Sequence, residues 1–227
     1  MGTPERILIM NVIQLIDLFY KNSLDNWRKD YDHFVIETLD NPGWFMRILN
    51  VYLDHHIKKI NLYKIDRTEV DWFVIRKAND KDNLPSCIDP VCGPLNFEEM
   101  VIETFKNFEE YNLIKTIDKT SHIFWLQRWY YFHCNEDWEH TYGVKIKALN
   151  DQGWEVKIAL SETDAEHKFN VTDKIKYPEG INIDYSIIGY EFSATCSPLG
   201  LDSTLGIFRE FWIKNIGEIY MYKKDSM

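Results

Sequence analysis

The sequence lacks the short motifs that identify common hydrolases, nucleotide-binding enzymes and zinc proteins. It contains no Gly-rich phosphate loop, no Gly-x-Ser-x-Gly, no His-Glu-x-x-His and no Cys-x-x-Cys. These motifs carry phosphate binding, a nucleophilic serine and zinc ligation. His133, Cys134 and His140, or Cys87 and Cys92, are close in sequence, but their spacing is not that of a structural zinc site. We therefore expect neither a metal nor a cofactor.

Cysteines and long apolar runs are also scarce. Four cysteines in 227 residues are too few for a disulfide framework and favour reduced thiols in a cytosol. The most apolar segment, Ile7 to Tyr20, is interrupted by Asn11, Gln14 and Asp17, and its length of about 14 residues is too short for a bilayer span. It has no basic region or cleavage site of a signal peptide. We expect a cytoplasmic protein that does not bind membranes.

The charge balance is acidic. The formal net charge is -10, shared by both halves of the chain, and 45% of the residues are hydrophobic. Such a chain can bury a core. Its acidity disfavours binding to nucleic-acid phosphates and steers basic proteins toward it. Acidity can also serve solubility alone. We expect a basic protein partner and no nucleic acid.

The most informative feature is an internal repeat, in which residues 12–50 match residues 123–160. The first four pairs are 111 residues apart: Val12 and Ile123, Leu15 and Leu126, Phe19 and Tyr130, Trp27 and Trp138. One residue is then lost, and the remaining pairs are 110 residues apart: Phe34 and Val144, Ile36 and Ile146, Leu39 and Leu149, Gly43 and Gly153, Trp44 and Trp154, Met46 and Val156, Ile48 and Ile158. Later, Asp71-Trp72 corresponds to Asp184-Tyr185, and Cys92-Gly93-Pro94-Leu95 to Cys196-Ser197-Pro198-Leu199.

A repeat of this length is the size of a domain and exceeds the periods of solenoids. We predict two related lobes, residues 1–112 and 120–227, joined by a linker at residues 113–119. Duplicated modules often adopt the two-fold arrangement of a homodimer. We therefore expect a monomer with internal pseudo-two-fold symmetry.

The periodicity of apolar residues predicts the same elements in each lobe: a helix, an antiparallel hairpin, a further strand and a closing helix, an α+β fold. The predicted helices span residues 7–21, 97–111, 121–132 and 201–215, and the further strands 70–76 and 183–192. Ser121 and Asn96 are placed as N-caps. Pro42-Gly43 suits a type II turn, and Gly153 supplies a positive φ in the second hairpin.

The second lobe resembles the bacterial immunity protein 53 family. Its run Cys134-Asn135-Glu136-Asp137-Trp138-Glu139-His140-Thr141-Tyr142-Gly143, which follows Trp129-Tyr130, is similar to the family's Cys-x-x-Asp-Trp-Glu-His-x-Tyr-Gly signature. The family's Thr-Leu-Asp-Asn-Pro-Gly-Trp turn is present in the first lobe as residues 38–44, and Gly93 to Glu99 is similar to its closing Gly-Pro-x-Asn-Leu-Glu-Glu. Each lobe keeps the part of the pattern that the other has lost.

The resemblance implies an immunity protein of a polymorphic toxin or contact-dependent growth inhibition system. Such a protein binds and neutralises a cognate toxin, for example a nuclease, in the producing cell. Two other hypotheses stay open. The first is a small acid/base enzyme that uses Asp137, Glu139 and His140, since an imidazole beside carboxylates can move protons near neutral pH. The second is a scaffold whose lobes bind two partners.

Candidate residues follow from the repeat and the resemblance. In an extended run Asp137 and Glu139 would share one face, and His140 and Trp138 the other. Structural or binding roles are favoured over catalysis, because the first lobe replaces Glu139-His140 with two basic residues. The residues proposed to contact the partner are Asp137, Trp138, Glu139, His140, Tyr142 and Trp129. The residues proposed to build the cores and turns are Trp27, Gly43, Trp44, Gly153 and Trp154.

Overall fold

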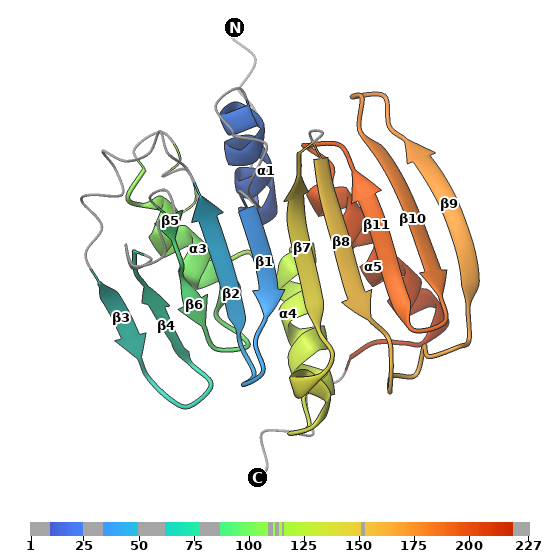
Figure 1. The fold of residues 1–227 in the computed structure, drawn as a ribbon, viewed down its shortest axis with the longest axis horizontal. Helices are drawn as coiled ribbons and strands as arrows, with labels where there is room; N and C mark the ends of the chain where they lie inside the picture. Colours follow the sequence, from blue (N-terminus) through green and yellow to red (C-terminus); the bar gives the residue numbers. More distant parts are fainter. Residues whose placement is uncertain are drawn as a thin grey trace, which may run out of the picture.

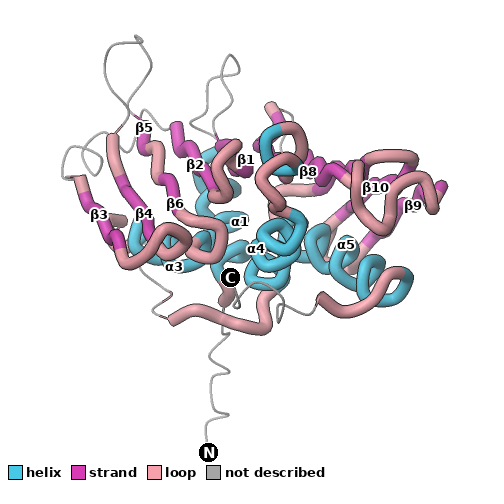
Figure 2. The backbone as a smooth tube through the Cα atoms, turned by 90° about the horizontal axis from the view of Figure 1, so that it is seen from below, coloured by secondary structure: helices cyan, strands magenta, loops and turns pink. Residues whose placement is uncertain are grey.

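The computed structural model describes residues 10–24, 34–49, 62–77, 87–108, 111, 114, 116–150 and 153–219. It is an α+β fold built on one antiparallel sheet of eleven strands. Their order is β3-β4-β6-β2-β1-β7-β8-β11-β10-β9, and β5 pairs with β2 beside this path. The four described α-helices cover one face of the sheet (Figures 1 and 2). We call the opposite side the open face.

Among the described residues, the first lobe supplies six strands and the second five, and each supplies two α-helices. The first lobe contains α1 (Val12–Ser23), β1 (Phe34–Thr38), β2 (Trp44–Leu49), β3 (Tyr63–Asp66), β4 (Trp72–Ile75), β5 (Cys87–Ile88), β6 (Val91–Cys92) and α3 (Phe97–Phe105). The second contains α4 (His122–His133), a 3-10 helix (Trp138–His140), β7 (Val144–Leu149), β8 (Gly153–Ala159), β9 (Asn170–Lys176), β10 (Asn182–Ile188), β11 (Glu191–Cys196) and α5 (Leu201–Asn215). The duplicated α+β organisation is confirmed.

The two lobes meet where β1 pairs with β7. In this pair Ile36 lies opposite Ile146, and Val35 and Glu37 lie opposite Lys147 and Lys145. Ile36 and Ile146 are also equivalent positions of the sequence repeat. A pseudo-two-fold axis therefore passes through this residue pair, perpendicular to the sheet. The strand order reads as the same five-strand series outward from the axis in both directions.

The helices cross this axis, because the first helix of each lobe reaches the hairpin of the other. The hydroxyl of Tyr20 on α1 accepts from the N–H of Gly153 at 2.8 Å and lies within hydrogen-bond distance of the Leu149 carbonyl at 3.0 Å. The hydroxyl of Tyr130 on α4 donates to the carbonyl of Leu39 at 2.9 Å. Leu39 and Leu149 are equivalent in the repeat.

The helices α1 and α4 begin at Val12 and His122, so Tyr20 and Tyr130 are structurally equivalent at an offset of 110. The predicted offset of 111 within the helices, which matched Phe19 with Tyr130, was wrong by one residue. The two lobes exchange equivalent contacts.

Aromatic packing follows the same exchange. The ring of Tyr20 lies 4.4 Å from that of Trp154, and the ring of Tyr130 lies 5.4 Å from that of Trp44. Both tryptophans are completely buried. Their indole N–H groups donate to the carbonyls of Pro198 and Pro94, each at 3.1 Å. Trp44 and Trp154, proposed as core residues of the two lobes, lie in one core cluster that both lobes share, whereas Trp27 lies outside the described residues.

Polar groups at the helix N-termini form a second reciprocal set of contacts. Asn11, the N-cap of α1, donates to the Asp202 carboxylate of α5 at 3.0 Å. Ser121, the predicted N-cap of α4, accepts from the Phe124 N–H and donates to the Glu98 carboxyl of α3. Each first helix is therefore joined at its start to the closing helix of the other lobe.

Both hairpin glycines are required for a reason other than the predicted one. Neither Gly43 nor Gly153 has a positive φ, so the type II turn at Pro42-Gly43 and the positive φ at Gly153 were wrong predictions. A Cβ at Gly43 would lie 2.4 Å from the carbonyl oxygen of Cys92, and one at Gly153 would lie 2.2 Å from that of Cys196. Close approach of the neighbouring strand excludes any side chain here.

The expected strand at residues 183–192 is two strands, β10 and the start of β11, separated by Gly189-Tyr190. The match of Asp71-Trp72 to Asp184-Tyr185 is also out of register. Phe73 lies opposite Cys92 in the sheet, and Ile183 lies opposite Cys196. Because Cys92 and Cys196 are equivalent, Phe73 is equivalent to Ile183. The shared Asp-aromatic pattern was misleading, since burial of the core sets the register.

Asn96 precedes α3 as predicted but does not cap it with its side chain. Its amide oxygen accepts from the Trp72 N–H at 3.3 Å, and its amide nitrogen donates to Asp71 at 2.8 Å. The start of α3 is instead reached by Gln127 of α4, whose amide oxygen accepts from the Phe97 N–H at 3.1 Å. This is another contact between a first helix and the closing helix of the other lobe.

No helix among the described residues is long and apolar enough to cross a membrane. All four cysteines are buried as thiols. The predicted lobe boundaries at residues 112 and 120 stay a prediction, although the sheet that the lobes share is continuous across the axis.

We expect Tyr20→Phe to destabilise the protein more than Tyr130→Phe. The first substitution leaves the buried Gly153 N–H without its acceptor, which costs about 1–3 kcal/mol, whereas the second removes one hydrogen bond to a carbonyl, worth about 0.5–1.5 kcal/mol. Urea denaturation of both variants and the double variant gives these free energies of unfolding. A smaller loss of unfolding free energy for Tyr20→Phe than for Tyr130→Phe would contradict the role of the Tyr20 hydroxyl as acceptor for the Gly153 N–H.

Stability should depend on pH through Glu98. Burial raises the pKa of this carboxyl to about 7, against the Ser121 hydrogen bond, which lowers it. The folded state therefore holds a proton that the unfolded state releases from about pH 4.5 upward, so this group lowers the stability as the pH rises from about 4.5 to 7. The stability of Glu98→Gln relative to wild type should rise across that window and level off above it. A difference independent of pH would refute this assignment.

Candidate functional site

The signature run of the second lobe folds into a compact turn between α4 and β7. The Glu139 carboxylate accepts from the N–H of Asn135 at 2.8 Å and of Glu136 at 3.0 Å. The Asn135 side chain accepts in turn from the N–H of Asp137 and of Trp138. Glu136 has a φ of 80°, a conformation that non-glycine residues adopt at a cost. The Glu139 carboxylate therefore holds the turn in this shape.

The turn corrects the expected extended run. Trp138 to His140 form a 3-10 helix, so alternate residues do not share a face. Trp138 and Glu139 are buried, and Asp137 and His140 are exposed. Both oxygens of Glu139 are engaged by backbone N–H groups of its own turn. The arrangement gives Glu139 a structural role, and it does not present the three residues as a catalytic acid–base group.

The two tryptophans proposed as partner contacts are in the core. Trp129 and Trp138 are 0% and 1% exposed, and their rings pack edge to face with centroids 6.0 Å apart. Trp129 also contacts Phe208 and Trp212 of α5. The indole N–H of Trp138 donates to the carbonyl of Ser161 at 2.7 Å. Their side chains do not reach the surface, so the proposal of partner contact is limited to Asp137, His140 and Tyr142.

A depression of about 330 Å³ opens beside this turn, on the open face of the sheet. Its lining comes from the turn, from the loop after β1, and from the strands β1, β7, β8 and β11. Most residues of these strands that line it alternate with core residues and so lie on the open face of the sheet. The lining residues are Glu37, Thr38, Asp40, Glu139, His140, Thr141, Tyr142, Gly143, Val144, Lys145, Lys157, Ala159 and Glu191. It brings Glu139, His140 and Tyr142 together with residues from both lobes.

Charged side chains dominate this lining. The amine of Lys145 lies 2.9 Å from the Glu37 carboxylate across the β1–β7 pair. Lys157 lies 3.2 Å from Glu155. Asp40, Glu191 and His140 are exposed. Since the lining holds four carboxylates and two lysines, a cationic surface would find an excess of negative charge there.

Among the described residues, the strand lining of the depression is not repeated on the other side of the pseudo-two-fold axis. Lys145 and Ala159 correspond to Val35 and Leu49, which are 7% and 3% exposed. Glu37 corresponds to Lys147, which reverses the charge. Duplication has therefore left one depression of this composition on the described part of the open face.

Sequence reasoning missed the strand residues of the depression, Glu37, Lys145, Lys157 and Glu191. They come from four strands that only the sheet brings together. The available signal was the alternation of charged with apolar residues in β7 and β8, which marks a solvent-facing side. Within the described residues, no group of three His, Cys, Asp or Glu side chains is arranged to hold a metal ion.

Comparison with known families decides the relationship. The sequence model of immunity protein 53 matches the chain twice, at residues 13–110 and 123–213. The chain belongs to the immunity protein 53 family. The predicted tandem duplication is confirmed, because each match covers one lobe of the sheet. Searches of curated proteins and of solved structures found no significant match.

Membership of the immunity protein 53 family supports an immunity function for the chain. It also separates the roles of the signature residues. In the second lobe Trp138 and Glu139 shape the turn. His140 and Tyr142 line the depression, and Asp137 is exposed on the turn outside this lining.

Glu139→Gln should destabilise the protein by about 1–3 kcal/mol, because an amide can accept only one of the two backbone hydrogen bonds and its NH₂ would face the other N–H. Asp137→Asn is the matched control, and this exposed residue should change stability by less than about 0.5 kcal/mol. Urea denaturation measures both effects. Equal effects for the two variants would show that the Glu139 carboxylate does not hold the turn.

Proposed function

We propose that this protein binds a cognate bacterial toxin in the producing cell and neutralises it as a stoichiometric inhibitor. The observation that carries the proposal is the double match to the immunity protein 53 family, which covers both lobes. A toxin encoded beside the gene in a polymorphic or contact-dependent system is the expected partner. The cytoplasm is where this inhibitor would meet a toxin that acts inside the cell.

The shape of the protein supports a binding role. The described helices leave the open face of the sheet uncovered (Figure 2), and the depression on this face combines residues of both lobes. Asp40, His140 and Glu191 expose charged or titratable groups at its rim. The excess of carboxylates favours a basic toxin surface through electrostatic steering. Since the depression combines both lobes and its strand lining is not repeated across the axis among the described residues, one toxin per chain is the expected stoichiometry.

Co-expression with the toxin domain encoded by the neighbouring gene tests the proposal. The protein should co-purify with the toxin and protect the cells. Asp40→Lys should weaken the complex about tenfold or more, since like charges at an interface oppose association. Glu179→Lys, an exposed site in the β9–β10 turn, makes the same charge change away from the depression and should bind like wild type.

Isothermal titration calorimetry with the purified toxin domain measures both affinity and stoichiometry. Absence of binding and of protection would refute the proposed function. Equal losses for Asp40→Lys and Glu179→Lys would show that binding depends on net charge rather than on the depression.

A further inference from the structure

An exposed aromatic residue stands beside the depression, on the hairpin that joins β10 and β11. Tyr190 is 52% exposed and Ile188 is 51% exposed. Gly189, with a φ of 61°, precedes Tyr190 in this two-residue connection. A glycine of positive φ at the first central position is typical of a type II′ hairpin. The backbone of the hairpin therefore carries Tyr190 outward in a defined position.

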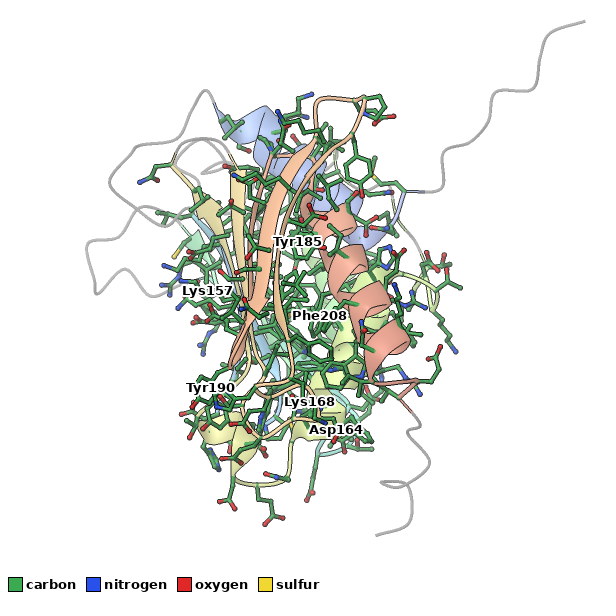
Figure 3. The ribbon with its side chains drawn as sticks, turned by 90° about the vertical axis from the view of Figure 1, so that its right-hand side faces the viewer. Lys157, Asp164, Lys168, Tyr185, Tyr190 and Phe208 are labelled. Carbon is green, nitrogen blue, oxygen red and sulfur yellow. The ribbon has the colours of Figure 1, made fainter. Side chains whose placement is uncertain are left out.

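The loop at residues 161–168 fixes this hairpin from the side. The N–H of His167 donates to the carbonyl of Gly189 at 2.8 Å, and the N–H of Leu160 donates to the carbonyl of Tyr190. The His167 ring packs edge to face on the Tyr190 ring, with centroids 4.1 Å apart. Tyr190 lies on the same side of the sheet as Lys157, away from α5 (Figure 3). A ring held in this way loses little entropy when a partner covers it.

Two glutamates belong to the segments that carry and support this ring. Glu191 follows Tyr190 directly and lines the depression. Glu166 lies beside His167, with its carboxylate 4.0 Å from the imidazole, and also accepts from the N–H of Glu162 at 2.8 Å. An exposed aromatic face near negative charge suits a guanidinium or an ammonium group, which binds the ring through cation–π attraction and the carboxylates through charge.

We propose that Tyr190, with Ile188, His167, Glu166 and Glu191, forms the Tyr190 surface, which docks an arginine- or lysine-bearing segment of the partner protein. The inference rests on the proposed function, because the partner is the toxin, and it names the chemistry of the toxin segment that binds here. Charge complementarity selects this occupant. Nucleic-acid phosphates would meet Glu166 and Glu191, and a second copy of the chain would bring the same carboxylates together.

The first experiment uses a synthetic peptide with four arginines spaced by serines, and its glutamate counterpart. Fluorescence anisotropy should show binding of the arginine peptide alone. Tyr190→Ala should weaken this binding at least about fivefold, whereas Tyr190→Phe should stay within about twofold, because the phenyl ring keeps the cation–π contact. Tyr63→Ala is the matched control, since Tyr63 is 44% exposed on β3, the opposite edge strand. Equal binding by wild type and Tyr190→Ala would overturn the proposal.

The second experiment repeats the series with the toxin domain and separates the two proposals. Loss of affinity in Tyr190→Ala, with Tyr190→Phe and Tyr63→Ala unchanged, supports the Tyr190 surface. If wild type and Tyr190→Ala bind the toxin equally, the Tyr190 surface is refuted and the immunity function stands. If the toxin does not bind wild type, the immunity function fails, and the toxin-docking role falls with it. Sedimentation that shows dimers of wild type but monomers of Tyr190→Ala would also overturn the proposal, in favour of a second copy.

Discussion

The pairing of β1 with β7 is the constraint on which the rest of the structure depends. Ile36 and Ile146 are equivalent in the repeat and lie opposite each other, so one antiparallel contact sets the pseudo-two-fold axis. In an antiparallel pair of equivalent strands, a two-fold axis passes either through a pair of opposite residues, as here, or midway between two such pairs. The position of every other strand follows, because each lobe adds its strands outward from the axis. It also removes the two free edges that separate lobes would expose at β1 and β7.

Contacts between the first helix of each lobe and the other lobe stabilise the pairing of β1 with β7. Tyr20 and Tyr130 satisfy backbone groups of the opposite hairpins, and Asn11 and Ser121 bond to carboxyl groups of the opposite closing helices. Separation of the lobes would expose the aromatic core that they share and leave these polar groups without partners. The acidic groups at these junctions are not fully satisfied, since one oxygen each of Asp17, Glu98 and Asp202 is buried without a hydrogen bond. Burial raises the pKa of Asp17 well above its usual value. Burial of these carboxyl groups carries a desolvation cost, which their hydrogen bonds offset in part.

Elements with strong periodicity could be predicted from the sequence. The helices and hairpins at the axis bury one face, so their apolar residues recur at helical or alternating spacing. Strand β9 escaped prediction because it is an edge strand, in which Thr172, Asp173 and Lys174 are all exposed, so no alternation marks it. The glycines at the hairpins were recognised as necessary. They are required because a strand about fifty residues later in the chain passes close to them, and rules for local turns cannot predict such a contact. The sequence also does not show that the first helix of each lobe packs on the hairpin of the other lobe. The same repeat would be found if each helix packed on the hairpin of its own lobe.

The candidate site shows why a signature is an incomplete guide to a surface. Trp129 and Trp138 are the most distinctive residues of the second lobe, and both are core residues. A tryptophan in a small lobe contributes more buried area than any other residue, so its position tolerates little change even when no partner touches it. Surface residues such as Asp40, Tyr190 and Glu191 carry no such constraint from packing. After duplication, the two copies had to keep the same core to preserve the axis, while the open face could differ between them. Around the depression, Lys145 takes the place of the apolar Val35 at the dyad-related position, and Glu37 stands where the other lobe has Lys147. This is the asymmetry expected if one partner engages the chain off the axis.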